Sequence, residues 1–147
     1  MSSRTLDLIG DIGGTNARFA LTDPMLPQVL LHAEHALPNA QFASLQHAAE
    51  HYLALVGAKP RRAAIAVASP VGHDEIRLTN RAWSFSVSEL QRTLGLQRLQ
   101  MINDFGAVAH AIPELTAHDR ETLHGDPHAP LIGPVSVLGP GTGLGVG

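Results

Sequence analysis

A glycine turn near the start of the chain combines residue types that can hold phosphate groups. In the segment Asp11–Asn16, Gly13 and Gly14 are followed by a threonine and an asparagine, and apolar runs lie on both sides. The two glycines let the backbone bend tightly and approach a ligand closely. A carboxylate at the end of a buried strand suits a Mg²⁺ shell, so Asp11 is a candidate metal residue. An ordinary hairpin that needs glycine for its backbone angles is the alternative.

The second candidate is the pair Asn103-Asp104, which follows an apolar run and precedes a helix-like pattern. Ligands gather at the carboxyl ends of strands in open α/β sheets. Asp104 could accept a proton from a substrate hydroxyl while Asn103 orients that hydroxyl or its neighbour, as phosphoryl transfer requires. The competing interpretation is that Asp104 only caps the helix that follows.

The third candidate is the segment Gly139–Gly147, in which every second residue is glycine. Such a backbone can aim several N–H groups at one anion, which predicts a second phosphate-binding loop. A flexible tail is the alternative interpretation of the same composition.

A weaker signal lies at residues 79–83, where amide and hydroxyl side chains precede the only tryptophan. Sugar sites mix such polar groups with an apolar wall, so Thr79 and Asn80 are candidate substrate residues. A hairpin with Trp83 in the core explains the pattern equally well. The nine histidines lack the spacing and the partners of a zinc site, so no zinc site is predicted.

The composition of the 147-residue chain narrows the class of protein. Hydrophobic residues make up 44% and charged residues 16%, which is typical of a globular domain. A formal net charge of -3 without a basic stripe argues against nucleic acid or an anionic membrane as partners. The chain has no cysteine and no run of the ~18 apolar residues that a membrane span needs, so we expect a cytoplasmic location.

The hydrophobic pattern also predicts the elements that position these candidates. Residues 5–10 and 17–22 form an antiparallel pair around the glycine turn, and residues 28–36 form a third strand. Apolar residues at helical spacing from Phe42 to Val56 predict a helix that Gly57 ends. A short apolar run at residues 63–68 is typical of a strand covered on both faces.

The second half of the chain continues the alternation of strands and helices. Ser86–Glu89 is a capping box that opens a helix to about Leu94, with Gly95 at its end. A strand at residues 99–102 leads into a helix at residues 105–112. The remaining expectations are a short helix at 116–123, a linker at 124–134 and a last strand at 134–138. This order indicates an α/β mixed sheet with helices packed on it.

Four motifs in this order resemble the bacterial glucokinase family of the actin-like, sugar-kinase/Hsp70 superfamily. They are Gly10-Asp11-Ile12-Gly13-Gly14-Thr15-Asn16-Ala17-Arg18, Thr79-Asn80-Arg81-Ala82-Trp83-Ser84-Phe85-Ser86, Ile102-Asn103-Asp104-Phe105 with Ala111-Ile112-Pro113, and Gly139-x-Gly141-Thr142-Gly143-Leu144-Gly145. The similarity runs over the whole chain, and four motifs in register are more specific than any one of them. The resemblance implies a ribonuclease H-like (actin-like ATPase) domain with a mixed five-stranded sheet.

The resemblance implies transfer of the ATP γ-phosphate to the 6-hydroxyl of glucose, with Mg²⁺. Asp104 would be the general base, and the sugar would be bound by Asn103, Asp104, Thr79 and Asn80. The residues implied to hold ATP are Asp11, Gly13, Gly14, Thr15, Asn16, Gly141, Thr142 and Gly143, with Asp11 near the metal through water. Glucose and ATP are thus the implied partners, and a homodimer is an open alternative.

Family chains are much longer, so the resemblance implies only their small N-terminal domain and the start of the large one. The expected division is a domain at residues 1–124, a linker at 125–133 and the start of a second domain at 134–147. The Glu and His residues that hold the sugar from the other side are missing, as is the adenosine pocket. Because phosphoryl transfer depends on positioning both reactants, we expect the isolated chain to be inactive or nearly so.

Two other functions stay open. A kinase of the same fold could act on another hexose, such as N-acetylmannosamine, mannose or fructose. A non-catalytic assembly module is an alternative from a different class. In that case residues 134–138 would be a strand without its hairpin partner, which leaves an edge open to pairing.

Overall fold

The computed structural model describes residues 6–78, 82–130, 132–140 and 144–147. It divides into two compact units, Met1–Asp104 and Phe105–Gly147, and each unit is described by itself. The domain division expected from the sequence, with a linker at residues 125–133, stays a prediction.

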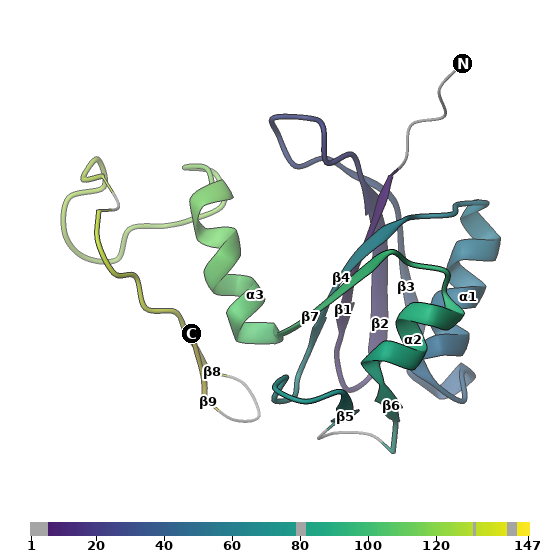
Figure 1. The fold of residues 1–147 in the computed structure, drawn as a ribbon. Coiled ribbons are helices and arrows are strands. Elements are labelled where there is room, and N and C mark those ends of the chain that lie inside the picture. Colours follow the sequence, from purple (N-terminus) through teal and green to yellow (C-terminus); the bar gives the residue numbers. More distant parts are fainter. Residues whose placement is uncertain (1–5, 79–81, 131, 141–143) are drawn as a thin grey trace. The chain divides into compact units, whose positions relative to one another are not determined.

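A five-stranded sheet in the order β3-β2-β1-β4-β7 forms the centre of the first unit (Figure 1). Its strands are β1 (Asp7–Ile12), β2 (Asn16–Thr22), β3 (Leu31–Pro38), β4 (Arg62–Val67) and β7 (Arg98–Asn103). β2 runs antiparallel to both β1 and β3, whereas β1, β4 and β7 are mutually parallel. The predicted mixed five-stranded sheet with helices packed on it is therefore confirmed.

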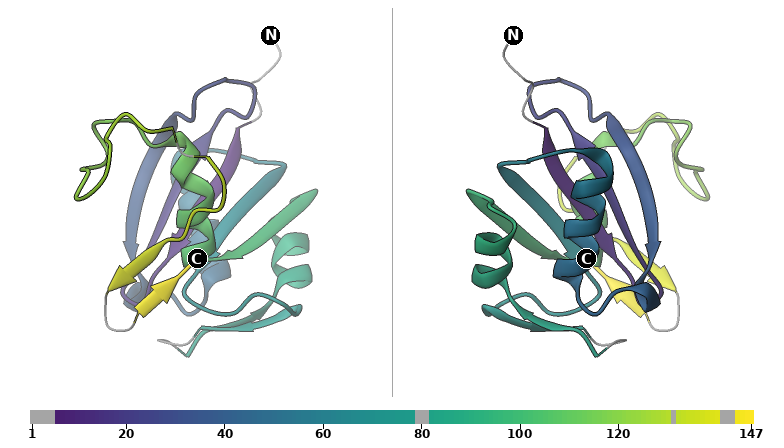
Figure 2. Two further views of the ribbon diagram at one scale, coloured as in Figure 1. Left: turned by 90° about the vertical axis from the view of Figure 1, so that its left-hand side faces the viewer. Right: turned by 90° about the vertical axis from the view of Figure 1, so that its right-hand side faces the viewer.

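One face of this sheet carries the core, because alternate strand residues point to the same side. Helices α1 (Leu45–Val56) and α2 (Val87–Thr93) lie on that same face (Figure 2). Tyr52 of α1 is fully buried, and its ring stacks on that of Phe19 with the centroids 5.3 Å apart. Gly10 lies opposite Phe19 in the ladder, and a Cβ there would come within 3.3 Å of the Phe19 ring. The absence of a side chain at Gly10 thus leaves space for the Phe19 ring, which packs against Tyr52.

The helix ends follow the signals in the sequence. The Ser44 side chain caps α1 by accepting a bond from the His47 N–H, and Gly57 ends it at a φ of 66°. Because Ser44 is the cap, the helix begins at Leu45, and Phe42 packs against the core before it. The start of α2 is also as predicted, since the Ser86 hydroxyl accepts from the Glu89 N–H at 3.1 Å. This is one half of the predicted capping box; the Glu89 carboxylate accepts from Arg92.

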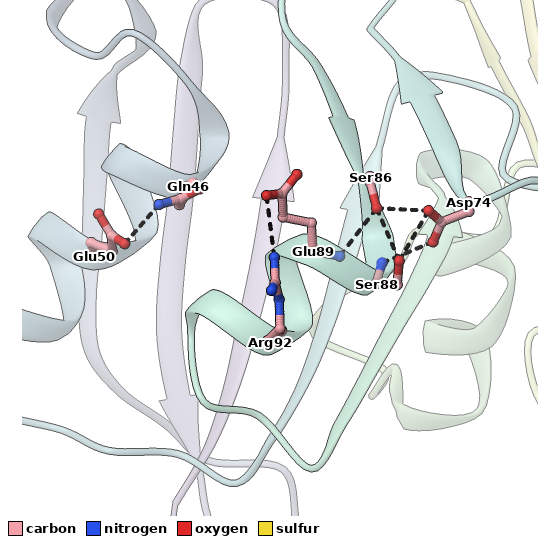
Figure 3. Close-up of polar contacts among 7 residues, drawn as sticks. All are labelled: Gln46, Glu50, Asp74, Ser86, Ser88, Glu89 and Arg92. Atoms are coloured by element: carbon pink, nitrogen blue, oxygen red, sulfur yellow. Dashed lines mark hydrogen bonds and ion pairs between the residues drawn. The ribbon is translucent and has the colours of Figure 1, made fainter.

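A cluster of hydrogen bonds ties α2 to a small hairpin of β5 (Glu75–Arg77) and β6 (Ser84–Ser86). The Asp74 carboxylate accepts from the Ser86 hydroxyl at 2.6 Å and from the Ser88 N–H at 2.8 Å (Figure 3). These bonds, the one from Ser86 first, hold the pKa of Asp74 below its ordinary value. The cluster therefore sets how the hairpin joins the helix.

The second unit contains fewer regular elements, and all its described residues are exposed or half-buried. Helix α3 (Asp104–Ala111) leads from the first unit into a 3-10 turn at Ile112–Glu114. The expected N-cap at Asp104 is wrong by one residue, because Asp104 is itself the first residue of α3. Strands β8 (Leu138–Pro140) and β9 (Leu144–Val146) form a hairpin.

Two expectations for this unit are wrong. Residues 116–123 are not helical, since the Asp119 carboxylate accepts from both the N–H and the hydroxyl of Thr116, a local turn that competes with helix formation. The last strand begins at Leu138 rather than at residue 134, and it pairs with β9 instead of lacking a partner. The strand without a hairpin partner, which suggested an assembly module, is therefore not found.

Several other strand bounds shift by one to three residues, with β3 at Leu31–Pro38 instead of 28–36 as the largest change. In the part of the chain that the structure describes, no helix is long and apolar enough to span a membrane.

Candidate functional site

The carboxyl ends of the three parallel strands meet at one edge of the sheet. The registers place Ile12 of β1 opposite Val67 of β4, and Val67 opposite Asn103 of β7. Adjacent strands lie ~4.8 Å apart, so Ile12 and Asn103 are separated by about 10 Å. The glycine turn that follows β1 and the pair Asn103-Asp104 are thus brought to the same edge, where ligands bind in sheets of this kind.

The glycine turn itself is a tight hairpin with Gly14 and Thr15 at its tip. The Gly13 N–H donates to the Asn16 carbonyl at 3.0 Å and closes the turn. Gly13 has no positive φ, and among the described residues a Cβ on it would meet only the Asn16 carbonyl oxygen, at an ordinary 3.6 Å. Neither backbone strain nor crowding within the protein requires glycine here. The open space beside Gly13 is therefore available for close approach of a ligand.

The buried residue Asn39, which is not part of any of the sequence motifs, holds this turn by hydrogen bonds. It follows β3 and lies opposite Thr15, one step beyond the ladder pair Asn16–Pro38. Its N–H donates to the Thr15 carbonyl at 2.9 Å, and its Nδ2 donates to the Gly13 carbonyl at 2.8 Å. A lone asparagine after a proline gives no signal in the sequence, because its partners lie 24 or more positions away.

Asp11 lies beside the turn, near the end of β1, and its side chain is exposed. It is opposite Arg18 in the β1–β2 ladder, and the two side chains form an ion pair with a 3.1 Å contact. Both side chains are more than half exposed, 53% for Asp11 and 59% for Arg18. Such an exposed pair contributes little to stability. The two-residue hairpin loop alone dictates this pairing, so the signal was present in the sequence.

Asn103 is joined to the sugar-side candidates by a short relay of hydrogen bonds. Its Nδ2 donates to the Ser69 carbonyl at 3.3 Å, and the Ser69 hydroxyl donates to the Arg77 carbonyl at 2.6 Å. Arg77 ends β5, next to the segment that contains Thr79 and Asn80, two candidates that lie outside the described residues. The relay therefore links the end of β7 to Arg77, just before that segment. The sequence analysis did not identify Ser69 as part of the site.

Trp83 closes the same segment, with its carbonyl accepting from the Leu78 N–H at 3.0 Å. Its side chain is buried and belongs to the hydrophobic core. The core interpretation of this tryptophan, which the sequence left open, is the one that the structure supports.

Asp104 directly follows β7 and is half-buried at the start of α3. Asp104 and Asn103 are thus adjacent at the ligand edge of the sheet, as the sequence predicted from their order.

The second glycine segment is a hairpin whose glycines face an aromatic ring. Gly139 and Gly145 are opposite each other in the β8–β9 ladder, and a Cβ on either would overlap the Phe105 ring. The candidates Gly141, Thr142 and Gly143 lie outside the described residues. Within the described residues of the whole chain, no group of three or more acidic or histidine side chains could hold a metal ion.

A search of protein families matches residues 8–147 to the model described as Glucokinase. The glucokinase of Nitrobacter hamburgensis is 44% identical over 147 residues, which cover 99% of this chain and 44% of that protein.

Solved structures agree with this match. A glucokinase from an Antarctic psychrotroph superimposes with a TM-score of 0.88 at 40% identity, over 98% of this chain and 46% of that one. The glucokinase of Balamuthia mandrillaris, solved with glucose, shares the fold at a TM-score of 0.67 and 23% identity, over 97% of this chain and 43% of that one.

The chain thus spans less than half the length of the relatives it matches. The family match covers the glycine turn, the Asn103-Asp104 pair and the β8–β9 hairpin together. The chain belongs to the glucokinase family.

Proposed function

We propose that this chain supplies one side of the active site of an ATP-dependent glucokinase, which transfers the γ-phosphate of ATP to the 6-hydroxyl of glucose. The observation that carries the proposal is the strand register that brings the glycine turn and Asn103-Asp104 to one sheet edge. With the ends of β1 and β7 about 10 Å apart, a sugar hydroxyl and a phosphate have room to meet at this edge. Membership of the glucokinase family supports the same assignment.

Asp104 acts as the general base in this proposal. One of its carboxylate oxygens accepts the proton of the 6-hydroxyl while the sugar's 6-oxygen bonds to the γ-phosphorus. The bond between the γ-phosphorus and the bridging oxygen breaks, and ADP leaves with the electron pair. Asn103 orients the sugar from the neighbouring position, and its relay through Ser69 keeps the amide in place. Thr79 and Asn80 are proposed to contact the sugar as well.

The turn Gly13–Asn16 holds the ATP phosphates in this proposal, with Gly14 and Thr15 at its tip. The open space beside Gly13, which a Cβ would fill, fits the approach of a phosphate oxygen to the backbone. Gly141, Thr142 and Gly143 are proposed as the second phosphate loop. A cytoplasmic location, where ATP is available, and the domain division expected from the sequence belong to the same proposal.

The donor set beside the turn fits a magnesium ion that keeps most of its water. Asp11 offers one exposed carboxylate, and Mg²⁺ is usually held by one or two carboxylates together with substrate phosphates. When bound, the ion neutralises charge on the phosphates. Release of Asp11 from Arg18 would free the carboxylate, and Arg18 could then face the phosphates.

The match covers 44% of the length of the Nitrobacter relative. The other contacts to glucose and ATP are proposed to come from the part of the glucokinase architecture that this match does not cover. The test is a coupled assay of glucose 6-phosphate formation on the complete product of the gene, with the 147 residues alone as the matched sample. We expect turnover by the complete product and at least ~10³-fold less by the 147 residues, because orientation supplies most of this catalysis.

Mannose, fructose and N-acetylmannosamine are assayed in parallel. A higher kcat/KM for one of these sugars would overturn glucose as the substrate. Robust turnover by the 147 residues alone would overturn the assignment of half a site to this chain.

A further inference from the structure

The Asn39 side chain stands out because its hydrogen bonding is only half complete. Asn39 is fully buried, and its Nδ2 and backbone N–H both donate to carbonyls of the glycine turn. Its Oδ1 is buried without a hydrogen-bond partner in the described structure. A buried polar atom without a partner is unfavourable, so packing alone does not explain an asparagine at this position.

The two bonds from Asn39 fix the orientation of two peptide units. In a trans peptide the carbonyl of one residue and the N–H of the next point in opposite directions. The Gly13 carbonyl is directed to Asn39, so the Gly14 N–H points away from it. The Thr15 carbonyl is likewise directed to Asn39, so the Asn16 N–H also points away.

We propose that Asn39 is a positioning residue that orients the Gly14 and Asn16 N–H groups toward the ATP phosphates. The inference rests on the proposed function of the turn and adds a residue outside the motifs. Gly14 is exposed at the tip of the turn, so a phosphate can reach its N–H without displacing a side chain. Asn39 acts only through the backbone and is too deeply buried to meet the ligand itself.

An apolar side chain of the same size separates positioning from packing. Asn39→Leu removes the bond to the Gly13 carbonyl and also the unpartnered Oδ1, so its effects on stability oppose each other. The backbone bond from residue 39 to the Thr15 carbonyl remains. Asn39→Asp keeps the shape of the side chain but cannot donate when ionised. Gln41→Leu is the matched control, since it makes the same change at an exposed position of the same 3-10 turn, Asn39–Gln41.

The experiment measures KM for ATP and for glucose, the melting temperature, and MgADP affinity by calorimetry, all on the complete gene product. For Asn39→Leu and Asn39→Asp we expect KM for ATP and Kd for MgADP to rise about tenfold, as one lost oriented contact would cause. KM for glucose should stay within about twofold, and Tm within about 5 °C for Asn39→Leu. Gln41→Leu should leave all four values unchanged.

Equal losses for ATP and glucose, or a fall in Tm without a change in MgADP affinity, would show a merely structural residue and overturn the proposal. Failure of both variants to fold would do the same. If no hexose is phosphorylated but MgADP binds and Asn39→Leu weakens it, the proposed function fails and the positioning role stands. If the wild-type protein does not bind MgADP, both are overturned.

Discussion

The two glycine hairpins of this chain differ in the space beside their glycines. Beside Gly13 the protein leaves open space, and a Cβ would make only an ordinary contact. At Gly139 and Gly145 the space is filled, because the Phe105 ring lies where a Cβ would be. A glycine-rich motif therefore says that something approaches the backbone, but not whether that partner is a ligand or a side chain of the same protein.

The supports of the two hairpins differ as well. The first turn joins strands of a five-stranded sheet and is held by the buried Asn39. The β8–β9 hairpin forms a separate two-stranded sheet, and its described residues are exposed or half-buried. Open space at a rigid turn suits binding without rearrangement, whereas local unfolding is cheaper where few apolar groups are buried.

The largest effect is expected from a change at the proposed base, which should impair proton transfer but leave phosphate binding by both hairpins intact. Asp104→Asn in the complete gene product should lower kcat for glucose by at least ~10², the typical worth of a general base. MgADP affinity should not change, since both hairpins are intact. Steady-state kinetics and calorimetry measure the two quantities, and an unchanged kcat would remove Asp104 from the base role.

Gly145→Ala tests the filled hairpin. The new methyl group meets the Phe105 ring, and overpacking of this kind destabilises a structure by about 1–3 kcal/mol. Hydrogen exchange at the Val137 and Gly147 amides, each of which donates to the other residue's carbonyl at 2.9 Å, should therefore speed up. The double variant with Phe105→Leu should recover part of the protection, while Phe105→Leu alone is the control. Unchanged exchange in Gly145→Ala would mean that the ring does not need this space.

Gly13→Ala is the matched change at the open hairpin, and the comparison expects the reverse pattern. The free energy of unfolding of the free protein should stay the same or rise by about 0.4–1 kcal/mol. Alanine fits this backbone conformation and lowers the conformational entropy of the unfolded chain. MgADP affinity should fall about tenfold if the methyl group takes the place of a phosphate contact. A lower Tm with normal MgADP affinity would break the comparison, since it would make both glycines structural.

The smallest effect concerns Asp74, which lies in neither hairpin. Its bonds from Ser86 and Ser88 lower its pKa, so the ionised carboxylate stabilises the folded state. That contribution is present above the unfolded pKa of about 3.9 and is lost as the pH falls through the lower folded value. Urea midpoints of wild type and Asp74→Asn should therefore differ at about pH 6, and the difference should shrink as the pH falls below the unfolded pKa. A difference that grows toward low pH would contradict the assigned bonds.

Much of the first unit was predictable because its signals are local. Ser44, Gly57 and Ser86 cap helices through neighbours within four residues, and short apolar runs marked β1, β4 and β7. The candidate Asn103-Asp104 could be placed at a strand end for the same reason. The helix expected at residues 116–123 failed because Thr116 and Asp119 satisfy each other in a turn, a choice that apolar spacing does not reveal.

The sequence by itself determined the strands of the five-stranded sheet, the family and the glycine turn, because propensity, capping and motif chemistry act over a few residues. The tertiary structure alone decided what surrounds that turn. Asn39 reaches it only through the β2–β3 register, and Phe105 takes the space at Gly145 only once the hairpin has formed. Whether a glycine has space beside it or faces a ring depends on residues far away in the chain, so only the folded chain answers it.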